Sequence, residues 1–229
     1  PVSLQSFTDL PCNAGDLVEA EMVSSRGYLG KTARAIRNLG PVDQKGAFSA
    51  LAVAEFGIRH VFPEPVLAES RGLKVPPAKG RSDLRDVPLV TIDGADARDF
   101  DDAVFAEPMD NGGWRLLVAI ADVAHYVRPG SALDEEARRR GNSVYLPDLV
   151  VPMLPEGISN DLCSLRPDED RAAMVAEINI DKDGKRTDFS IYRALIRSHA
   201  RLTYDQVQSV FEGSFDEADV GVEHGTLHN

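Results

Sequence analysis

The segment TIDGADARDFDD (residues 91–102) places five aspartates within ten positions, directly after an apolar run. That run, VPLVTI (87–92), is typical of a buried strand. Like charges crowded at the end of a strand repel one another and weaken a fold. When several carboxylates share one point, the pKa of at least one rises unless a cation is bound. Carboxylate oxygens are the ligands that Mg²⁺, Mn²⁺ and Ca²⁺ prefer. The segment therefore predicts a cation site.

Four of the five aspartates form the predicted set. A strand that ends at Asp93, followed by a tight loop, can bring Asp99, Asp101 and Asp102 to the same point. Asp96 falls outside this spacing and is predicted to be a solvent-facing loop residue. Four carboxylates could hold two ions, and two ions about 3.5–4 Å apart catalyse in-line displacement at a phosphodiester.

Two other interpretations of the cluster stay open. It could be a solvated acidic loop whose aspartates cap helices or form Asx turns, or part of an acidic structural domain that binds Ca²⁺. Two features favour the catalytic interpretation: the cluster follows a buried strand directly, and Phe100 gives the loop an apolar anchor between the acids. The segment DKDGK (181–185) lacks the terminal Glu of a calcium loop and predicts a hairpin turn.

Composition and charge exclude several classes of protein. The 229 residues are 43% hydrophobic, and the longest apolar run, LLVAIA (116–121), is far shorter than the roughly 20 residues of a membrane helix. Only Cys12 and Cys163 occur, so we expect two reduced thiols and no disulfide framework. The net charge is −12, with 11 basic against 9 acidic residues in 1–85 and 14 against 28 thereafter. The net charge of the whole chain does not reveal this asymmetry, so it does not indicate the class of substrate.

The first 85 residues predict a β unit, two helices and a linker. Two strands alone cannot bury an apolar face, so the strands predicted at 16–23 and 29–36 must belong to a larger β unit. The first helix is predicted to begin after Asp43 and to end at Gly57. Its predicted apolar stripe consists of Phe48, Leu51, Ala52 and Phe56. We predict strands at 16–23 and 29–36 across a turn containing Gly27, a second helix from Pro65 to before Gly72, and a linker at 73–83.

The remainder predicts a sheet with flanking helices. Ser131 and Asp134 suit a capping box, and Gly141 suits the position after the helix end, where Arg138, Arg139 and Arg140 complement the helix dipole. Residues 148–172 are predicted to be rich in loops. We predict strands at 87–92, 103–107, 114–123 and 143–147, a helix at 131–141, a long hairpin of 174–180 with 187–202, and a helix from Tyr204 to before Gly213 with Thr203 and Gln206 as its caps.

Three long stretches resemble one enzyme family. They are TIDGADARDFDDAVFAE (91–107), VAIADVAHYVRPGSALDEEARRRGNSVYLP (118–147) and PMLPEGISNDLCSLRP (152–167). Together they resemble the catalytic (RNB) domain of the ribonuclease II / ribonuclease R family, and the DARDFDD form is more similar to the ribonuclease R branch. The resemblance implies a Mg²⁺-dependent exoribonuclease that degrades single-stranded RNA from its 3′ end to 5′-mononucleotides, with Mn²⁺ as a possible substitute.

The resemblance also implies roles for particular residues. Asp93 and Asp102 match the direct Mg²⁺ ligands, and Asp99 and Asp101 complete the metal site. Tyr145 matches the tyrosine that stacks on the 3′-terminal base, which suits a sequence-tolerant nuclease because every base has a π-face. Arg166 could bind a phosphate or pair with Asp168 or Asp170. We assign no catalytic role to His125.

The implied fold is α+β. We expect the closing strands of a cold-shock (OB-type) β-barrel at 1–42, a helical connector and basic linker at 43–85, and the first part of an RNB domain at 86–229. The chain would then be a fragment with weak or no activity alone, since the family's transition-state arginine, second clamp aromatic and neighbouring glutamate lie further on. The alternative is a non-catalytic RNA-binding member. No leader pattern is visible, so we expect a cytoplasmic location and no membrane partner. We also expect the intact protein to be a monomer.

Overall fold

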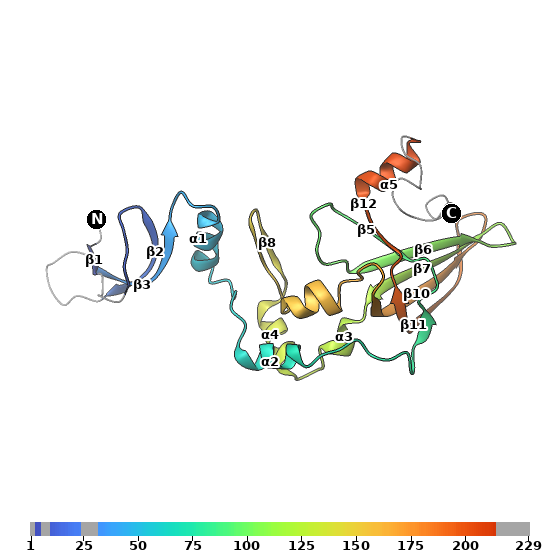
Figure 1. The fold of residues 1–229 in the computed structure, drawn as a ribbon, viewed down its shortest axis with the longest axis horizontal. Coiled ribbons are helices and arrows are strands. Elements are labelled where there is room, and N and C mark those ends of the chain that lie inside the picture. The colour runs from blue at the N-terminus through green and yellow to red at the C-terminus, as the bar shows by residue number, and fades with distance from the viewer. Residues whose placement is uncertain (1–2, 6–9, 24–31, 214–229) are drawn as a thin grey trace. The chain divides into compact units, whose positions relative to one another are not determined.

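The computed structural model describes residues 3–5, 10–23 and 32–213 (Figure 1). The chain divides into two compact units. The first contains Pro1–Phe62 and Ala137–Met153, and the second contains Pro63–Glu136 and Leu154–Asn229. The boundaries at residues 42 and 85 that the sequence predicts stay predictions. No helix in the described ranges is long and apolar enough to cross a membrane.

The first unit is built on a three-stranded sheet in the order β1-β3-β2. β2 and β3 are antiparallel, and β1 runs parallel to β3. The second strand of the predicted pair lies later than expected, and the predicted turn at Gly27 falls outside the described residues. The elements of this unit are β1 (Ser3–Gln5), β2 (Asp16–Val23), β3 (Thr32–Pro41), α1 (Ala47–Glu55), β8 (Val144–Leu146) and β9 (Leu149–Val151).

Helix α1 differs from its prediction in its cap and in its buried face. It begins after Gly46, whose φ of 90° is in the left-handed region, and no side chain caps it. The predicted stripe was wrong, because Phe48 and Phe56 are each 75% exposed. The helix instead buries its small residues Ala47, Ser49 and Val53. A stripe of large apolar residues therefore did not identify the inner face of this short helix.

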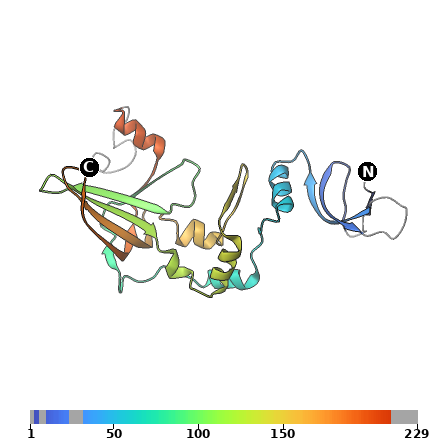
Figure 2. The same ribbon diagram turned by 180° about the vertical axis from the view of Figure 1, so that it is seen from behind.

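The second unit contains a mixed seven-stranded sheet, which with its helices confirms the α+β class. Its order is β12-β5-β6-β7-β10-β11-β4, and the β6–β7 and β10–β11 hairpins run side by side in both views (Figures 1 and 2). The pairs β12–β5 and β11–β4 are parallel and the rest antiparallel. The strands are β4 (Ser82–Leu84), β5 (Val90–Asp93), β6 (Asp102–Pro108), β7 (Trp114–Ala121), β10 (Asp170–Ile180), β11 (Arg186–Arg197) and β12 (Ala200–Thr203).

Short helices flank this sheet. The capping box of Thr203 and Gln206 is present at α5, as predicted. Helix α4 ends before Gly141, whose φ is 80°. At its start Asp134 N donates to Ser131 Oγ at 3.3 Å, which is one bond of the predicted capping box, and the Asp134 carboxylate accepts from Gly130 N at 2.8 Å. The helices are α2 (Glu64–Arg71), α3 (Val123–Tyr126), α4 (Ala132–Arg140, whose last turn belongs to the first unit), the π-helix η1 (Ile158–Leu162) and α5 (Tyr204–Phe211).

The predicted strand at 187–202 is interrupted, and this matters for the site. β11 ends at Arg197, and the chain enters β12 at Ala200, at the far end of the sheet order, where it pairs in parallel with β5. Val90, Ala200 and Leu202 form a buried cluster there, against which Ile92, Val104 and Val207 pack. β5, the strand that carries the first aspartate, is thus held between two strands. Its outer neighbour comes from the far end of the sequence.

Candidate active site

The four aspartates of the predicted set lie at one end of β5 and β6. β5 ends at Asp93, and β6 begins at Asp102. The two strands are antiparallel neighbours, paired through Val90 and Val104. Because one antiparallel strand ends where its neighbour begins, Asp93 and Asp102 come to the same end of the sheet. The other two lie in the connecting segment 94–101, which we call the aspartate loop.

The carboxylates in this region act on one another. Burial, and then the charge of Asp102, raises the pKa of Asp93, while the charge of Arg201 lowers it. The surrounding protein, and then the charges of Asp99, Asp102 and Asp93, raise the pKa of Asp101, although solvent still reaches its side chain. All four members of the predicted set therefore contribute to one electrostatic cluster. Asp96 is solvent-exposed, as predicted.

The cluster offers oxygen ligands but does not form a closed ligand set. Asp93 Oδ2 is buried and has no hydrogen-bond partner, which is rare for a carboxylate oxygen. Such an oxygen fits a hard cation, as does a donor set made only of carboxylates. Among the described residues, however, no three Asp, Glu, His or Cys side chains are arranged so that they could hold a metal ion. A cation bound here would have to draw mutually repelling carboxylates together.

Phe100 anchors the aspartate loop, as its apolar character predicts. The side chain is only 8% exposed. Its backbone is fixed from the segment after η1, because Phe100 N donates to Ser164 Oγ at 3.1 Å and Leu165 N donates to Phe100 O at 2.8 Å. Ser164 Oγ in turn donates to Arg98 O at 3.1 Å. These bonds hold the backbone on both sides of Asp99.

Arg201 holds the other end of the aspartate loop. It lies on β12 opposite Thr91 of β5, and its Nη2 donates to Gly94 O at 3.2 Å and to Ala95 O at 2.7 Å. Neither Arg201 nor Ser164 belongs to the set of site residues that the sequence predicts. Ser164 lies in the stretch 152–167 that resembles the family, but no local pattern assigns a role to either residue, since each reaches the loop only through contacts between distant parts of the chain.

Tyr145 lies on β8 in the first unit. It is opposite Val150 in the short antiparallel pair β8–β9, and it is 65% exposed. A largely exposed aromatic ring on a hairpin is suited to stacking against a base. The aspartates belong to the second unit, so the predicted stacking role of Tyr145 stays a prediction.

Arg166 pairs with different acids from those that the sequence suggested. Its Nη2 donates to Asn160 O at 2.6 Å, and its Nη1 lies 3.4 Å from Asp161 and 3.8 Å from Glu169. Of the suggested partners, Asp170 instead pairs with Arg85 and Arg197. The Arg166 side chain remains 41% exposed, so its predicted contact with a phosphate stays a prediction.

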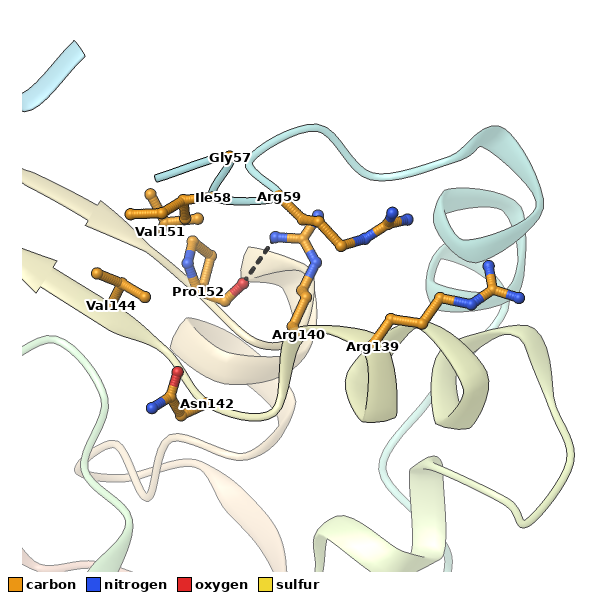
Figure 3. A pocket seen from close by; sticks show the side chains of 9 residues that line it. All are labelled: Gly57, Ile58, Arg59, Arg139, Arg140, Asn142, Val144, Val151 and Pro152. Carbon is orange, nitrogen blue, oxygen red and sulfur yellow. Dashed lines mark hydrogen bonds between the residues drawn. The ribbon is translucent and has the colours of Figure 1, made fainter. Parts of the chain in front are cut away.

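A pocket of about 260 Å³ lies in the first unit (Figure 3). Arg140 Nη1 donates to Pro152 O at 3.1 Å, its Nη2 donates to Val61 O at 3.0 Å, and its guanidinium lies 3.6 Å from the centre of the Phe62 ring. Arg140 thus bonds to carbonyls outside its own helix. We assign the pocket no catalytic role, because no carboxylate lines it. The lining residues are Gly57, Ile58, Arg59, Arg139, Arg140, Asn142, Val144, Val151 and Pro152.

A family model described as RNB domain matches residues 81–228. The chain belongs to the RNB domain family. Ribonuclease R of Vibrio parahaemolyticus is 53% identical over 194 residues, which cover 82% of this chain and 23% of that protein. Ribonuclease R of Escherichia coli is 54% identical over 170 residues, which cover 72% of this chain and 21% of that protein. The chain thus spans less than a quarter of the length of these RNB relatives.

A solved RNB structure is similar over almost the whole chain. Ribonuclease R of Mycoplasma genitalium, in complex with double-stranded RNA, superposes with a TM-score of 0.81 and 30% identity, covering 94% of this chain and 40% of that one. The yeast pseudonuclease Ssd1 superposes with a TM-score of 0.68 at 16% identity, covering 93% of this chain and 29% of that one. The second likeness concerns the fold alone.

Proposed function

We propose that the protein is a Mg²⁺-dependent exoribonuclease that removes 5′-mononucleotides from the 3′ end of single-stranded RNA. The observation that carries this proposal is the aspartate cluster at the end of β5 and β6, with the unpartnered Asp93 Oδ2, in a chain of the RNB family. The ribonuclease R relatives support the activity, and the RNA complexes of the Mycoplasma enzyme support RNA as the substrate.

In this proposal Asp93 and Asp102 are the direct ligands of Mg²⁺, and Asp99 and Asp101 complete the site. When bound, two such ions would stabilise the charge that develops on the scissile phosphate and the leaving oxygen. The protein's own contribution is to present four carboxylate groups from two strand ends and one anchored loop. Asp99 and Asp101 also orient the attacking water, for which their carboxylates are acceptors.

Two residues outside the cluster would hold the RNA in this proposal. Tyr145 stacks on the 3′-terminal base, a contact that tolerates any base. Arg166 binds a backbone phosphate through the part of its guanidinium that faces solvent. Because the chain spans a fraction of its relatives' length, we expect the 229-residue chain alone to show weak or no processive degradation.

The test uses the full-length protein with single-stranded RNA labelled at the 3′ or the 5′ end, in Mg²⁺ or in EDTA. We expect 5′-mononucleotides to be released from the 3′ end in Mg²⁺ only, and Asp101→Asn to abolish their release. Asp96→Asn, from the same loop but outside the proposed set, is the matched control and should retain activity.

Three outcomes would overturn the proposal. Internal cleavage products would indicate an endonuclease, and full activity in Asp101→Asn would remove the aspartates from the chemistry. RNA that is bound but never cut would indicate a non-catalytic RNA-binding member of the family.

A further inference from the structure

Two polar residues from distant parts of the chain hold the aspartate loop, one at each end. Arg201 holds the carbonyls directly after Asp93, and Ser164 holds the backbone on both sides of Asp99. We propose that Arg201 and Ser164 are positioning residues that fix the backbone of the aspartate loop, so that metal binding requires movement of the carboxylate side chains and not of the loop backbone. This inference rests on the proposed function, because it concerns the same site.

Arg201 fixes the exit from β5. β12 pairs in parallel with β5, which places Arg201 beside Thr91 and Thr203 beside Asp93. From this position one guanidinium nitrogen reaches two consecutive carbonyls, those of Gly94 and Ala95. A charged donor bonded to two neighbouring carbonyls restricts the backbone that follows Asp93, and so restricts where its carboxylate points.

Ser164 fixes the return of the loop toward β6. Its side chain is fully buried, and its hydroxyl both accepts from Phe100 N and donates to Arg98 O. A buried hydroxyl with both roles satisfied specifies one backbone geometry, because any shift leaves a buried polar group unpaired. Asp99 lies between the two bonded residues, and Asp101 follows them.

The two contacts are joined through Phe100. The Arg201 guanidinium carbon lies 5.1 Å from the centre of the Phe100 ring, a distance at which a cation attracts the face of an aromatic ring. Arg201 therefore contacts both the first residues of the loop and its apolar anchor. Residues that orient metal ligands in this way commonly change metal affinity about 10–100-fold when they are replaced.

The test measures Mn²⁺ binding and RNA cleavage in the full-length protein. Mn²⁺ is titrated by electron paramagnetic resonance, and kcat and KM are measured across the same concentrations. We expect Arg201→Gln to raise the Kd for Mn²⁺ about 10–100-fold and to lower kcat, with the KM for RNA unchanged. Arg201→Lys, which keeps the charge and a donor, should recover part of the affinity. Saturating Mn²⁺ should restore part of the lost rate.

A merely structural role gives a different result. Loss of stability lowers the melting temperature and the active fraction but leaves the Kd for Mn²⁺ of the folded molecules unchanged. Arg197→Gln is the matched control, since Arg197 lies at the end of β11, the strand that precedes β12 in the sequence, and pairs with Asp170. If Arg201→Gln does not fold, Ser164→Ala tests the opposite end of the loop and should also raise the Kd for Mn²⁺.

The inference fails if the variants that fold keep the wild-type Kd for Mn²⁺ and the wild-type kcat. That failure is distinct from failure of the proposed function. In the first case the wild type binds Mn²⁺ and cleaves RNA while the positioning variants match it. In the second case the wild type does not cleave RNA in either metal.

Discussion

Arg81 and Asp122 form a buried ion pair, with 2.7 Å between Nη2 and Oδ2 and side chains that are 5% and 0% exposed. Arg81 belongs to the basic segment that the sequence predicts to be a linker, whereas Asp122 directly follows β7. Arg193 of β11 lies 3.2 Å from the same carboxylate oxygen, and Arg81 Nη1 donates to Ala194 O at 3.3 Å. The pair therefore ties the segment before β4 to two strands of the sheet.

We expect Arg81→Met to lower the free energy of unfolding by about 3–5 kcal/mol, because it removes one partner of a buried charge. Arg193 stays beside Asp122, which favours the lower part of that range. Urea denaturation of wild type and variant measures the change. Arg197→Met is the control, since its pair with Asp170 is partly exposed and worth less than about 1 kcal/mol. Equal losses in the two variants would contradict a special role for the buried pair.

Glu177 makes part of the stability of the second unit depend on pH. It accepts from Arg115 Nε and from the Tyr192 hydroxyl, each at 2.7 Å. The Arg115 bond first, and then the Tyr192 bond, holds the pKa of Glu177 below its ordinary value of 4.5. A carboxyl whose pKa is lower in the folded state stabilises the fold above its unfolded pKa. That contribution is lost as the pH falls through the folded value.

We therefore expect Glu177→Gln to lower the free energy of unfolding at pH 7 by on the order of 1 kcal/mol. The difference from wild type should narrow below pH 4.5, the ordinary pKa of this group, as the wild-type carboxyl becomes protonated. Urea denaturation at neutral and acid pH measures both values. A difference that stays constant with pH would show that the side chain acts through packing and not through its charge.

Replacing Asp93 should stabilise the metal-free protein and remove the stabilisation that metal binding gives. The Asp93 carboxylate is partly buried and lies close to other negative charges, which raises its pKa. In EDTA we expect Asp93→Asn to raise the melting temperature by about 2–4 °C, the shift that about 1 kcal/mol gives in a domain of this size. In millimolar Mn²⁺ the order should reverse, because binding stabilises only the wild type. Differential scanning fluorimetry measures both conditions.

Asp96→Asn is the control for this reversal. It removes a charge from the same loop but from a solvent-exposed side chain, so Mn²⁺ should stabilise it as it does the wild type. If Mn²⁺ stabilises neither the wild type nor Asp96→Asn, the aspartates of this chain do not bind the metal by themselves.

Local patterns in the sequence predicted the parts of the site that local chemistry decides. The end of a strand at Asp93 and the capping box of Thr203 and Gln206 depend on neighbouring residues. The apolar character of Phe100 predicted its burial, but not its bonds to Ser164 and Leu165. The face of α1 was mispredicted, because large apolar side chains such as Phe48 mark the inner face only where a partner surface covers them.

Pairing between distant segments could not be predicted. The run 187–202 is continuously strand-like, and nothing within it marks Ser198 and His199 as the point where the chain passes from β11 to β12. The parallel pairing of β12 with β5 depends on the whole sheet. Arg201 therefore looks like an ordinary strand residue in the sequence, and its contact with the aspartate loop is visible only in the fold.

Tyr145 offers a test of base stacking that is independent of the metal site. If its exposed ring stacks on the 3′-terminal base, Tyr145→Ala in the full-length protein should lose about 1–3 kcal/mol of binding and raise the KM for single-stranded RNA about 5- to 150-fold. Tyr145→Phe keeps the ring and should match the wild type. Tyr204→Ala is the control, because Tyr204 is similarly exposed, at 63% against 65%. Equal KM values for the two alanine variants would indicate that Tyr145 is part of the hairpin structure and does not contact the substrate.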